Sequence, residues 1–240
     1  MQGFTVHEVS PTLEITVQRE APRLPSALEA EIDRLWQSAQ ERLSGALFNG
    51  RVFSADTVTA QHIAGHFTEF RRIVAQMARS ELYAELGLRP LAVNGIVRLS
   101  NGILLGRRSP RTAYQAGMWQ LPPAGSIDLG AADTNGRIDL TAQLLKELAE
   151  ETGITAERSA VGAPLCIVEH PRSHVLDIGI PLVISLDGET ALTRHRNLAN
   201  GEYDPLQVIP EAELAARLSA LGSALVPSAR LFLTRLGLIG

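Results

Sequence analysis

Apolar side chains recur at helical spacing in two stretches of the first third of the chain. The first begins at Ser26, where Glu29 completes an S-x-x-E capping box, and its apolar residues then return every three or four positions. The second covers residues 68–86. Between them, residues 51–63 have the composition of short strands. The pattern predicts two amphipathic helices joined by strands.

The rest of the chain is richer in strand patterns. Residues 91–108 contain two apolar runs on either side of a turn at Asn101, which predicts a hairpin. A loop rich in Gly and Pro follows, and then a helix for which Asp139 is the expected N-cap and Gly153 the expected C-cap. Later apolar runs predict core strands and a terminal helix. Strands that surround a few helices without regular alternation indicate an α+β fold.

The composition limits what the protein is expected to bind. Of the 240 residues, 45% are hydrophobic and 20% are charged, the net charge is −4 and the pI is about 5.9. Such a chain has no basic field for nucleic acid or membrane surfaces, so neither is an expected partner. The sequence shows neither a secretory signal pattern nor an apolar run of roughly 20 residues. The single cysteine, Cys166, is expected to be a small buried hydrophobic residue. Because one cysteine cannot form an internal disulfide and no signal pattern is present, the sequence predicts a cytoplasmic protein.

Three glutamates lie on one turn of the predicted helix. Glu147, Glu150 and Glu151 stand at i, i+3 and i+4, so their carboxylates project from one face, opposite Leu144 and Leu148. Like charges at these spacings weaken a helix slightly. One interpretation is a solvated surface. The other is a divalent-cation site, because Mg²⁺ is commonly held by a few carboxylates together with substrate phosphates.

The segment KELAEETGI resembles the end of the Nudix box, whose pattern is G-x5-E-x7-R-E-U-x-E-E-x-G-U with U a bulky aliphatic residue. The matching positions are Glu147, Leu148, Glu150, Glu151, Gly153 and Ile154. Upstream, WQLPPAG is similar to the W-x-x-P-G-G approach to the box, which makes Gly125 the box glycine. The resemblance implies a Nudix α/β/α sandwich with a mixed sheet over residues 89–240. Residues 1–88 would then be an N-terminal α/β extension that docks on this core or on a second subunit.

The box departs from the family pattern in three respects. Ala131 stands where the family has its first glutamate, and Lys146 stands where arginine is usual. Twenty residues separate Gly125 from Lys146, where the pattern allows thirteen, so the loop carries an insertion of seven. Asp133 and Asp139 are the candidates for replacing the lost carboxylate.

The N-terminal part carries a narrower resemblance. LW, ALFNG and TEFR, followed by RPLAVNGIV and GRRS, are similar to an atypical Nudix subgroup whose characterised animal member hydrolyses UDP-glucose and UDP-galactose. This resemblance implies a nucleoside diphosphate sugar pyrophosphatase that acts on a small nucleotide and releases UMP and sugar 1-phosphate. Two alternatives stay open: an ADP-ribose or dinucleotide pyrophosphatase, and a nucleotide sensor without turnover, which Ala131 and Lys146 favour. A homodimer is an open alternative to a monomer.

The family resemblance also assigns site residues. Glu150 and Glu151 would ligate Mg²⁺, or Mn²⁺ in its place, and the carbonyl oxygen of Gly125 would be a further ligand. Glu147 would be another ligand or would help to activate water, so the three glutamates are the expected catalytic residues. Glu202 lies where many Nudix proteins have one more acidic residue. Its alternative is an ordinary loop carboxylate.

Two arginines end the second strand of the predicted hairpin. A guanidinium group can hold two phosphate oxygens at once, so Arg107 or Arg108 is expected to bind the diphosphate, the alternative being half-exposed strand arginines. Tyr114 either stacks on a base or packs within its loop. Trp119 is expected in the core.

Overall fold

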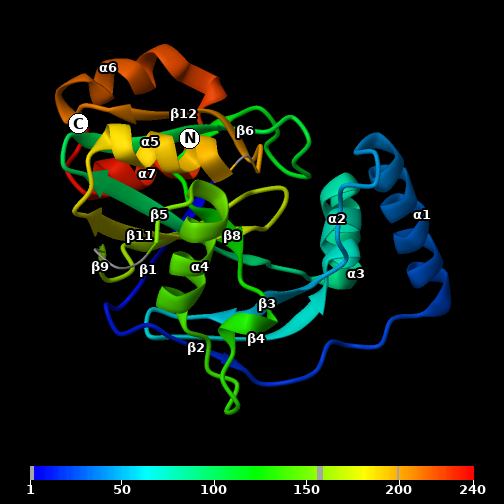
Figure 1. Ribbon diagram of the computed structural model, residues 1–240. Helices are drawn as coiled ribbons and strands as arrows, with labels where there is room; N and C mark the ends of the chain where they lie inside the picture. The colour runs from blue at the N-terminus through cyan, green and yellow to red at the C-terminus, as the bar shows by residue number, and fades with distance from the viewer. Residues whose placement is uncertain (1–2, 156–158, 199) are drawn as a thin grey trace.

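The computed structural model describes residues 3–155, 159–198 and 200–240 (Figure 1). Its strands are β1 (Thr5–Glu8), β2 (Glu14–Val17), β3 (Arg51–Val58), β4 (His62–Glu69), β5 (Leu91–Leu99), β6 (Gly102–Arg108), β7 (Trp119–Gln120), β8 (Ala124–Ser126), β9 (Ser159–Val161), β10 (Cys166–Glu169), β11 (Leu176–Ile184) and β12 (Tyr203–Ile209). Its α-helices are α1 (Ser26–Arg42), α2 (Phe70–Ala78), α3 (Tyr83–Leu86), α4 (Leu140–Thr152), α5 (Gly188–Leu198), α6 (Glu211–Leu221) and α7 (Pro227–Arg235). Within these ranges, the chain has no helix with both the length and the apolar character needed to cross a bilayer.

The larger of the two sheets is mixed. Its strand order is β1-β10-β11-β5-β6-β12, and the short strands β9, β8 and β7 pair with β11, β5 and β6. Strand β11 runs parallel to β5, with Ile178 opposite Val93. Strand β1 pairs antiparallel with β10, with Thr5 opposite Glu169. Residues from the beginning of the chain therefore belong to the same sheet as the strands after residue 90.

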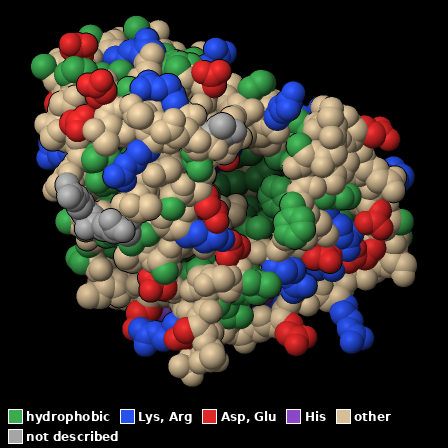
Figure 2. Space-filling model, in the orientation of Figure 1, with side chains coloured by type: hydrophobic (Ala, Val, Ile, Leu, Met, Phe, Trp, Pro, Cys, Tyr) green, Lys and Arg blue, Asp and Glu red, His purple; other side chains and the backbone are tan. Residues whose placement is uncertain are grey.

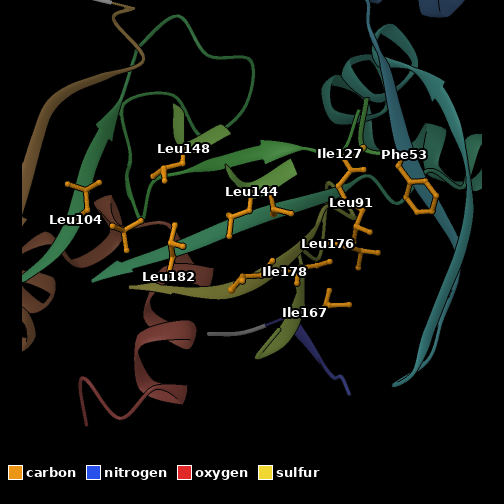
Figure 3. Close-up of a cluster of buried hydrophobic side chains, with 14 of the residues drawn as sticks. Phe53, Leu91, Leu104, Ile127, Leu144, Leu148, Ile167, Leu176, Ile178 and Leu182 are labelled. Atoms are coloured by element: carbon orange, nitrogen blue, oxygen red, sulfur yellow. The ribbon is translucent and has the colours of Figure 1, made fainter. Parts of the chain in front are cut away.

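The two faces of this sheet pack against different helices, because successive side chains of a strand point to opposite sides. On β6, Leu104 belongs to a core cluster shared with α4 and α5, whereas Ile103 and Leu105 belong to a cluster shared with α6 and α7. Figure 3 shows the first cluster, where Leu144 and Leu148 of α4 meet residues of the strands. Helices thus cover both faces of a mixed sheet, which confirms the α+β class and the sandwich predicted from the sequence.

A smaller sheet, in the order β2-β4-β3, contributes to the same core. Phe53 of β3 and Ile63 and Phe67 of β4 belong to one buried cluster with Leu91 of β5. The rings of Phe53 and Phe67 meet edge to face with centroids 5.7 Å apart. The division of the chain at residues 88 and 89 stays a prediction, but side chains from both sides of that boundary share this cluster.

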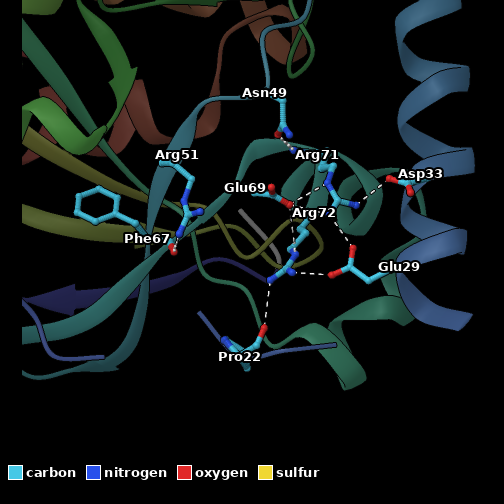
Figure 4. Close-up of polar contacts among 9 residues, drawn as sticks. All are labelled: Pro22, Glu29, Asp33, Asn49, Arg51, Phe67, Glu69, Arg71 and Arg72. Carbon is cyan, nitrogen blue, oxygen red and sulfur yellow. Dashed lines mark hydrogen bonds and ion pairs between the residues drawn. The ribbon is translucent and has the colours of Figure 1, made fainter. Parts of the chain in front are cut away.

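Ion pairs join helices α1 and α2 (Figure 4). Arg71 lies 2.7 Å from Glu29 and 2.8 Å from Asp33, both on α1, and its Nε donates to Glu69 at the end of β4 over 2.8 Å. Arg72 also pairs with Glu29. Burial opposes the charge of Glu29, but the hydrogen bond from Arg71 and the charge of Arg72 hold its pKa below the usual value. The ion pairs fix how α1 lies beside α2.

Two helix starts differ from the sequence prediction. Helix α1 has Pro25 at its N-cap and no side-chain cap, so the capping box expected from Ser26 and Glu29 does not form. Glu29 is held by the arginines of the next helix instead. The stretch 68–86 is not one helix: its first two residues continue β4, and α2 ends at Ala78, before a 3₁₀ turn at Ser80–Leu82 and the separate helix α3. Helix α2 therefore begins at Phe70.

Candidate active site

Helix α4 begins and ends where the sequence predicts. The Oδ1 atom of Asp139 accepts the N–H of Ala142 at 2.9 Å, and Gly153 follows the last turn in a left-handed conformation with φ 72°. Leu144 and Leu148 are fully buried against the sheet. Caps at both ends and an apolar face on the sheet fix the rotation of the helix, and with it the direction of its acidic face.

The acidic face of α4 lines a cavity of about 510 Å³, here called the acidic cavity. Glu147 and Glu151 reach it from α4, Asp128 from the loop after β8, and Glu202 from the segment before β12. Gly125 lies directly against Glu147, since a Cβ at this position would overlap the carboxylate. In Figure 2 the molecule is hollowed between α4 and the α1–α2 pair. Four carboxyl groups thus line one cavity, together with Arg51.

A second cavity of about 360 Å³, here called the inner cavity, adjoins the acidic cavity. The residues that line both are Phe48, Phe70, Ala124, Gly125, Ser126 and Glu202. The inner cavity is also lined by Arg108 and Asn94, whose Nε and Nδ2 atoms are buried without a hydrogen-bond partner in the described structure. A buried donor is unfavourable until an acceptor reaches it. This end of the cleft therefore suits a ligand rich in oxygen acceptors.

Glu151 is held in place by hydrogen bonds to one of its two oxygens. Its Oε2 atom accepts the N–H of Ala124 at 2.9 Å and the hydroxyl of Tyr203 at 3.0 Å. Burial first, and then the charges of Glu202 and Glu147, raise its pKa well above the usual value, against the effect of the two hydrogen bonds. The side chain is only 4% exposed. Its surroundings disfavour the negative charge unless a cation is close by.

Glu147 stands one helical turn before Glu151 and is half-buried. The amide of Gln143 donates to its Oε1 atom at 2.6 Å. Burial raises the pKa of Glu147 to about 7, opposed by this hydrogen bond and reinforced by the charge of Glu150. A carboxyl group with a pKa near neutrality can take up or release a proton at physiological pH.

The donor set fits a hard divalent cation, since Mg²⁺ prefers carboxylate oxygens and four carboxylates line this cavity. Lys146 on the same helix is paired with Asp128, and its charge also favours the ionised form of Glu147. The described His, Cys, Asp and Glu side chains nevertheless form no group of three close enough to hold a metal ion.

The structure separates the three glutamates expected on one face. Glu147 and Glu151 line the acidic cavity, whereas Glu150 is exposed and lines neither cavity of the cleft. Glu202, which comes from another part of the chain, lines both. The assignments of these glutamates and of Gly125 as catalytic residues or metal ligands stay predictions.

The two arginines at the end of the hairpin also differ in exposure and in whether they line the cleft. Arg108 is half-buried and lines the inner cavity. Arg107 is exposed, and its Nε donates to the carbonyl of Gly117 at 3.1 Å. Tyr114, for which stacking and packing were both open, lines the inner cavity and makes hydrogen bonds through its hydroxyl. Trp119 lies in the core, as predicted.

The loop before α4 contains an acidic residue that the sequence reasoning missed. Asp133 accepts two N–H groups of its own loop, Asp139 caps α4, and neither lines the acidic cavity. Asp128 lines it instead. Asp128 matches no position of the Nudix box. Its location three residues after Gly125 was the signal in the sequence that could have indicated it. Tyr203 was missed as well, although it follows Glu202 directly.

Comparisons with known proteins find solved structures that resemble this chain at low sequence identity. No protein-family model and no curated protein matches the chain. A protein from Deinococcus radiodurans is 16% identical over 60% of this chain and 80% of that one, with a TM-score of 0.43. A Nudix hydrolase from M. smegmatis is 18% identical, with coverages of 62% and 83% and a TM-score of 0.42. A MutT Nudix hydrolase from Burkholderia pseudomallei is 20% identical, with coverages of 61% and 96% and a TM-score of 0.42.

Such distant likenesses carry no conclusion about the activity of this chain. The cleft itself has carboxyl groups at one end and buried donors without a partner at the other.

Proposed function

We propose that this protein is a Mg²⁺-dependent pyrophosphohydrolase of the Nudix type that cleaves the diphosphate of a nucleoside diphosphate sugar. The observation that carries the proposal is the cleft in which the acidic cavity, with Glu147, Glu151 and Glu202, adjoins the inner cavity, with Arg108. The sequence resemblance favours a UDP-sugar, which would give UMP and sugar 1-phosphate.

The acidic cavity is the place for the cation. Glu147, Glu151, Glu202 and Asp128 would hold it, with the carbonyl oxygen of Gly125 as a further donor. Bound Mg²⁺ supplies polarisation of the diphosphate and a lowered pKa for the attacking water. The charge of Glu151 is disfavoured by burial, so this carboxylate gains most from a nearby opposite charge.

The side chains of the cleft divide the remaining work. Water attacks one phosphorus atom, a new O–P bond forms, and the bond from that phosphorus to the bridging oxygen breaks. Glu147 would be either a ligand of the cation or the group that accepts the proton of the water. Arg108, which lines the inner cavity, would donate to the phosphate oxygens through its guanidinium group. Phe48, which is 85% exposed beside the cleft, and Phe70 offer apolar surface to the base or sugar.

A nucleotide sensor without turnover is the second candidate. Ala131, where the family has a glutamate, is buried and contributes no carboxylate. Lys146 pairs with Asp128 rather than with a glutamate of its own helix. Both features favour binding without hydrolysis. An ADP-ribose or dinucleotide pyrophosphatase would use the same cleft. It would differ from a UDP-sugar pyrophosphatase in the group that the inner cavity accepts.

A substrate panel with Mg²⁺, in which products are separated by chromatography, tests these assignments. The proposal expects UMP and sugar 1-phosphate from UDP-glucose or UDP-galactose, with a higher kcat/KM than for ADP-ribose or nucleoside triphosphates. The highest kcat/KM for ADP-ribose would overturn the substrate. Nucleotide binding that raises the melting temperature without any product would establish the sensor instead.

A further inference from the structure

A short loop separates the inner cavity from a third and larger one. This outer cavity has a volume of about 870 Å³ and is lined by residues of α1, α2 and the segment 170–173. The residues that line both the inner and the outer cavity are Met77, Ala113, Tyr114 and Gln115. Three of these are consecutive in the loop between β6 and β7. The loop is therefore the wall between the two cavities.

The wall is fastened through the hydroxyl group of Tyr114. Its oxygen lies 3.0 Å from Nδ1 of His170 and 2.9 Å from Oγ of Ser173, and Nε2 of His170 lies 2.7 Å from Asp177. His170, Ser173 and Asp177 are all buried. The carboxylate of Asp177 can only accept, so Nε2 of His170 donates to it. The hydroxyl of Tyr114 lies within hydrogen-bond distance of both Nδ1 of His170 and Oγ of Ser173.

The buried groups behind the wall face both cavities. His170 and Ser173 line the outer cavity, and Asp177 lines the inner one. The loop itself is only half-buried between Ala113 and Gln115. Gln115 has a left-handed φ of 52°, which a side-chain-bearing residue adopts only where its surroundings hold it. The N–H of Met118 donates to the carbonyl of Gln115 at 3.2 Å, and the hydroxyl of Tyr114 fastens the neighbouring side chain to His170 and Ser173.

We propose that Tyr114 sets the size of the group that the substrate carries beyond its diphosphate. With the wall in place, a substrate is confined to the acidic and inner cavities. At about 360 Å³, the inner cavity is at the small end of ligand pockets, which span roughly 300–1,000 Å³. Together with the acidic cavity it would admit a nucleoside diphosphate linked to one sugar, and the wall would exclude a second nucleoside. This inference rests on the proposed function.

The outer cavity has the surface that a second nucleoside would need. Leu35 and Met118 give it apolar sides, and Arg42 and Arg172 are exposed cations on its lining. Removal of the Tyr114 ring would join this cavity to the inner one, because the ring lies on the lining of both. The cleft would then be long enough for a dinucleotide, whose second base and ribose would enter the outer cavity.

Three variants of the full chain test the proposal. Tyr114→Ala removes the ring of the wall, and Tyr114→Phe keeps the ring but removes the hydroxyl. Met118→Ala is the matched control, because Met118 lines the outer cavity alone and its truncation leaves the wall intact. Binding of UDP-glucose and of a uridine dinucleotide with a diphosphate bridge is measured by calorimetry with Mg²⁺, and kcat/KM is measured alongside.

Tyr114→Ala is expected to raise the preference for the dinucleotide over UDP-glucose by about tenfold or more, the scale on which pocket size discriminates between substrates. Tyr114→Phe is expected to raise it less, and Met118→Ala is expected to leave it unchanged. An unchanged preference in Tyr114→Ala, or an equal rise in Met118→Ala, would overturn the inference. If Tyr114→Ala fails to fold, the preference of Tyr114→Phe for the dinucleotide over UDP-glucose decides: a rise supports the inference and no change overturns it.

The two proposals fail in distinguishable ways. A wild-type protein that binds both nucleotides without hydrolysing them overturns the enzymatic function, and the ratio of the two dissociation constants in the variants still decides the role of Tyr114. If neither the wild type nor Tyr114→Ala binds either nucleotide, both proposals are overturned.

Discussion

The hydroxyl of Tyr203 donates a hydrogen bond of 3.0 Å to Oε2 of Glu151, and both side chains are buried. The ring of Tyr203 is packed tightly over Gly106 of β6, where a Cβ would collide with it. Gln120 donates to the same hydroxyl oxygen. Strand β12 thus positions the carboxylate of a residue on α4, and leaves the Oε1 atom of Glu151 for another partner.

Tyr203→Phe should therefore affect both stability and activity. The substitution keeps the ring but leaves Glu151 and Gln120 each short of a partner in a buried place. We expect the free energy of unfolding to fall by about 1–3 kcal/mol and kcat to fall as Glu151 loses its orientation. Urea unfolding and a rate assay on UDP-glucose measure the two effects. Tyr83→Phe, at a tyrosine outside the cleft, is the control, and equal behaviour of the two variants would contradict the assigned role.

The neighbouring residues Arg107 and Arg108 provide a matched pair. Arg108→Ala should raise KM by about ten- to a hundredfold, the range for loss of a hydrogen bond to a charged group. Arg107→Ala should change KM little, because its guanidinium donates to the carbonyl of Gly117 at the surface. Steady-state kinetics on both variants measures the difference. A larger effect at Arg107 would place the diphosphate on the other side of the strand.

Local signals in the sequence were enough to predict helix α4 and its orientation. Asp139 and Gly153 cap the helix as expected, and Leu144 and Leu148 are buried as the helical spacing requires. Each of these features depends on residues within one or two turns. Helix α5 gave no comparable signal, because Ala191 is its one fully buried apolar side chain and the rest of the helix is largely polar.

The composition of the cleft depends on contacts between distant parts of the chain. The two-residue period of a strand indicates that Arg107 and Arg108 point to opposite sides, but not which of them faces the cleft. Glu202 reaches Glu151 because β12 pairs with β6, a pairing that no local pattern encodes. Asp128 is brought into the cavity by the inserted loop, whose course the family pattern does not describe.

The stability of the cation-free protein should depend on pH through Glu147. Its pKa is about 7 in the folded protein and 4.5 without the fold's influence, so the folded state holds a proton that the unfolded state releases. The resulting contribution is fully present below pH 4.5 and is lost as the pH rises through 7. It amounts to at most about 3 kcal/mol.

Urea unfolding at pH 5 and pH 8 with a chelator measures this dependence. Glu147→Gln should show a smaller loss of stability between the two values than the wild type. Mg²⁺ should reduce the loss in the wild type, because a cation favours the ionised carboxylate. The same pH dependence in Glu147→Gln and in the wild type would show that other groups cause it.

Residues 3–88 should be required for the stability of the remainder. Their two hairpin strands supply Phe53, Ile63 and Phe67 to the core cluster that also holds Leu91. A fragment that starts near Leu88 would expose this apolar surface, so we expect it to be poorly soluble or to melt at a lower temperature. Phe53→Ala in the full chain, with an expected cost of about 3–5 kcal/mol, tests the same contact without truncation. A fragment with unchanged melting behaviour and activity would show that the extension is a separate unit.

Glu151→Gln distinguishes a metal site from ordinary surface charge. The amide keeps the size of the side chain, and its oxygen can accept from Ala124 and Tyr203 as the carboxylate does. Without Mg²⁺, stability should hold or rise by a few tenths of a kcal/mol or more, because repulsion with Glu147 is relieved in a buried place. With Mg²⁺, the variant should lose much of the stabilisation that the cation gives the wild type, since a neutral amide is a weaker ligand for a hard dication.

Turnover of Glu151→Gln should fall by orders of magnitude, because the cation supplies the activated water and stabilises the leaving phosphate. Glu150→Gln on the same turn tests the exposed glutamate: a normal melting response to Mg²⁺ would remove Glu150 from the ligands, and a lost response would add it. A solvated acidic face predicts no effect on metal response or rate at either position. Melting temperatures with and without Mg²⁺, together with one rate assay, therefore decide the question. A normal response and a normal rate in Glu151→Gln would make the three glutamates ordinary surface charge, despite the burial of one of them.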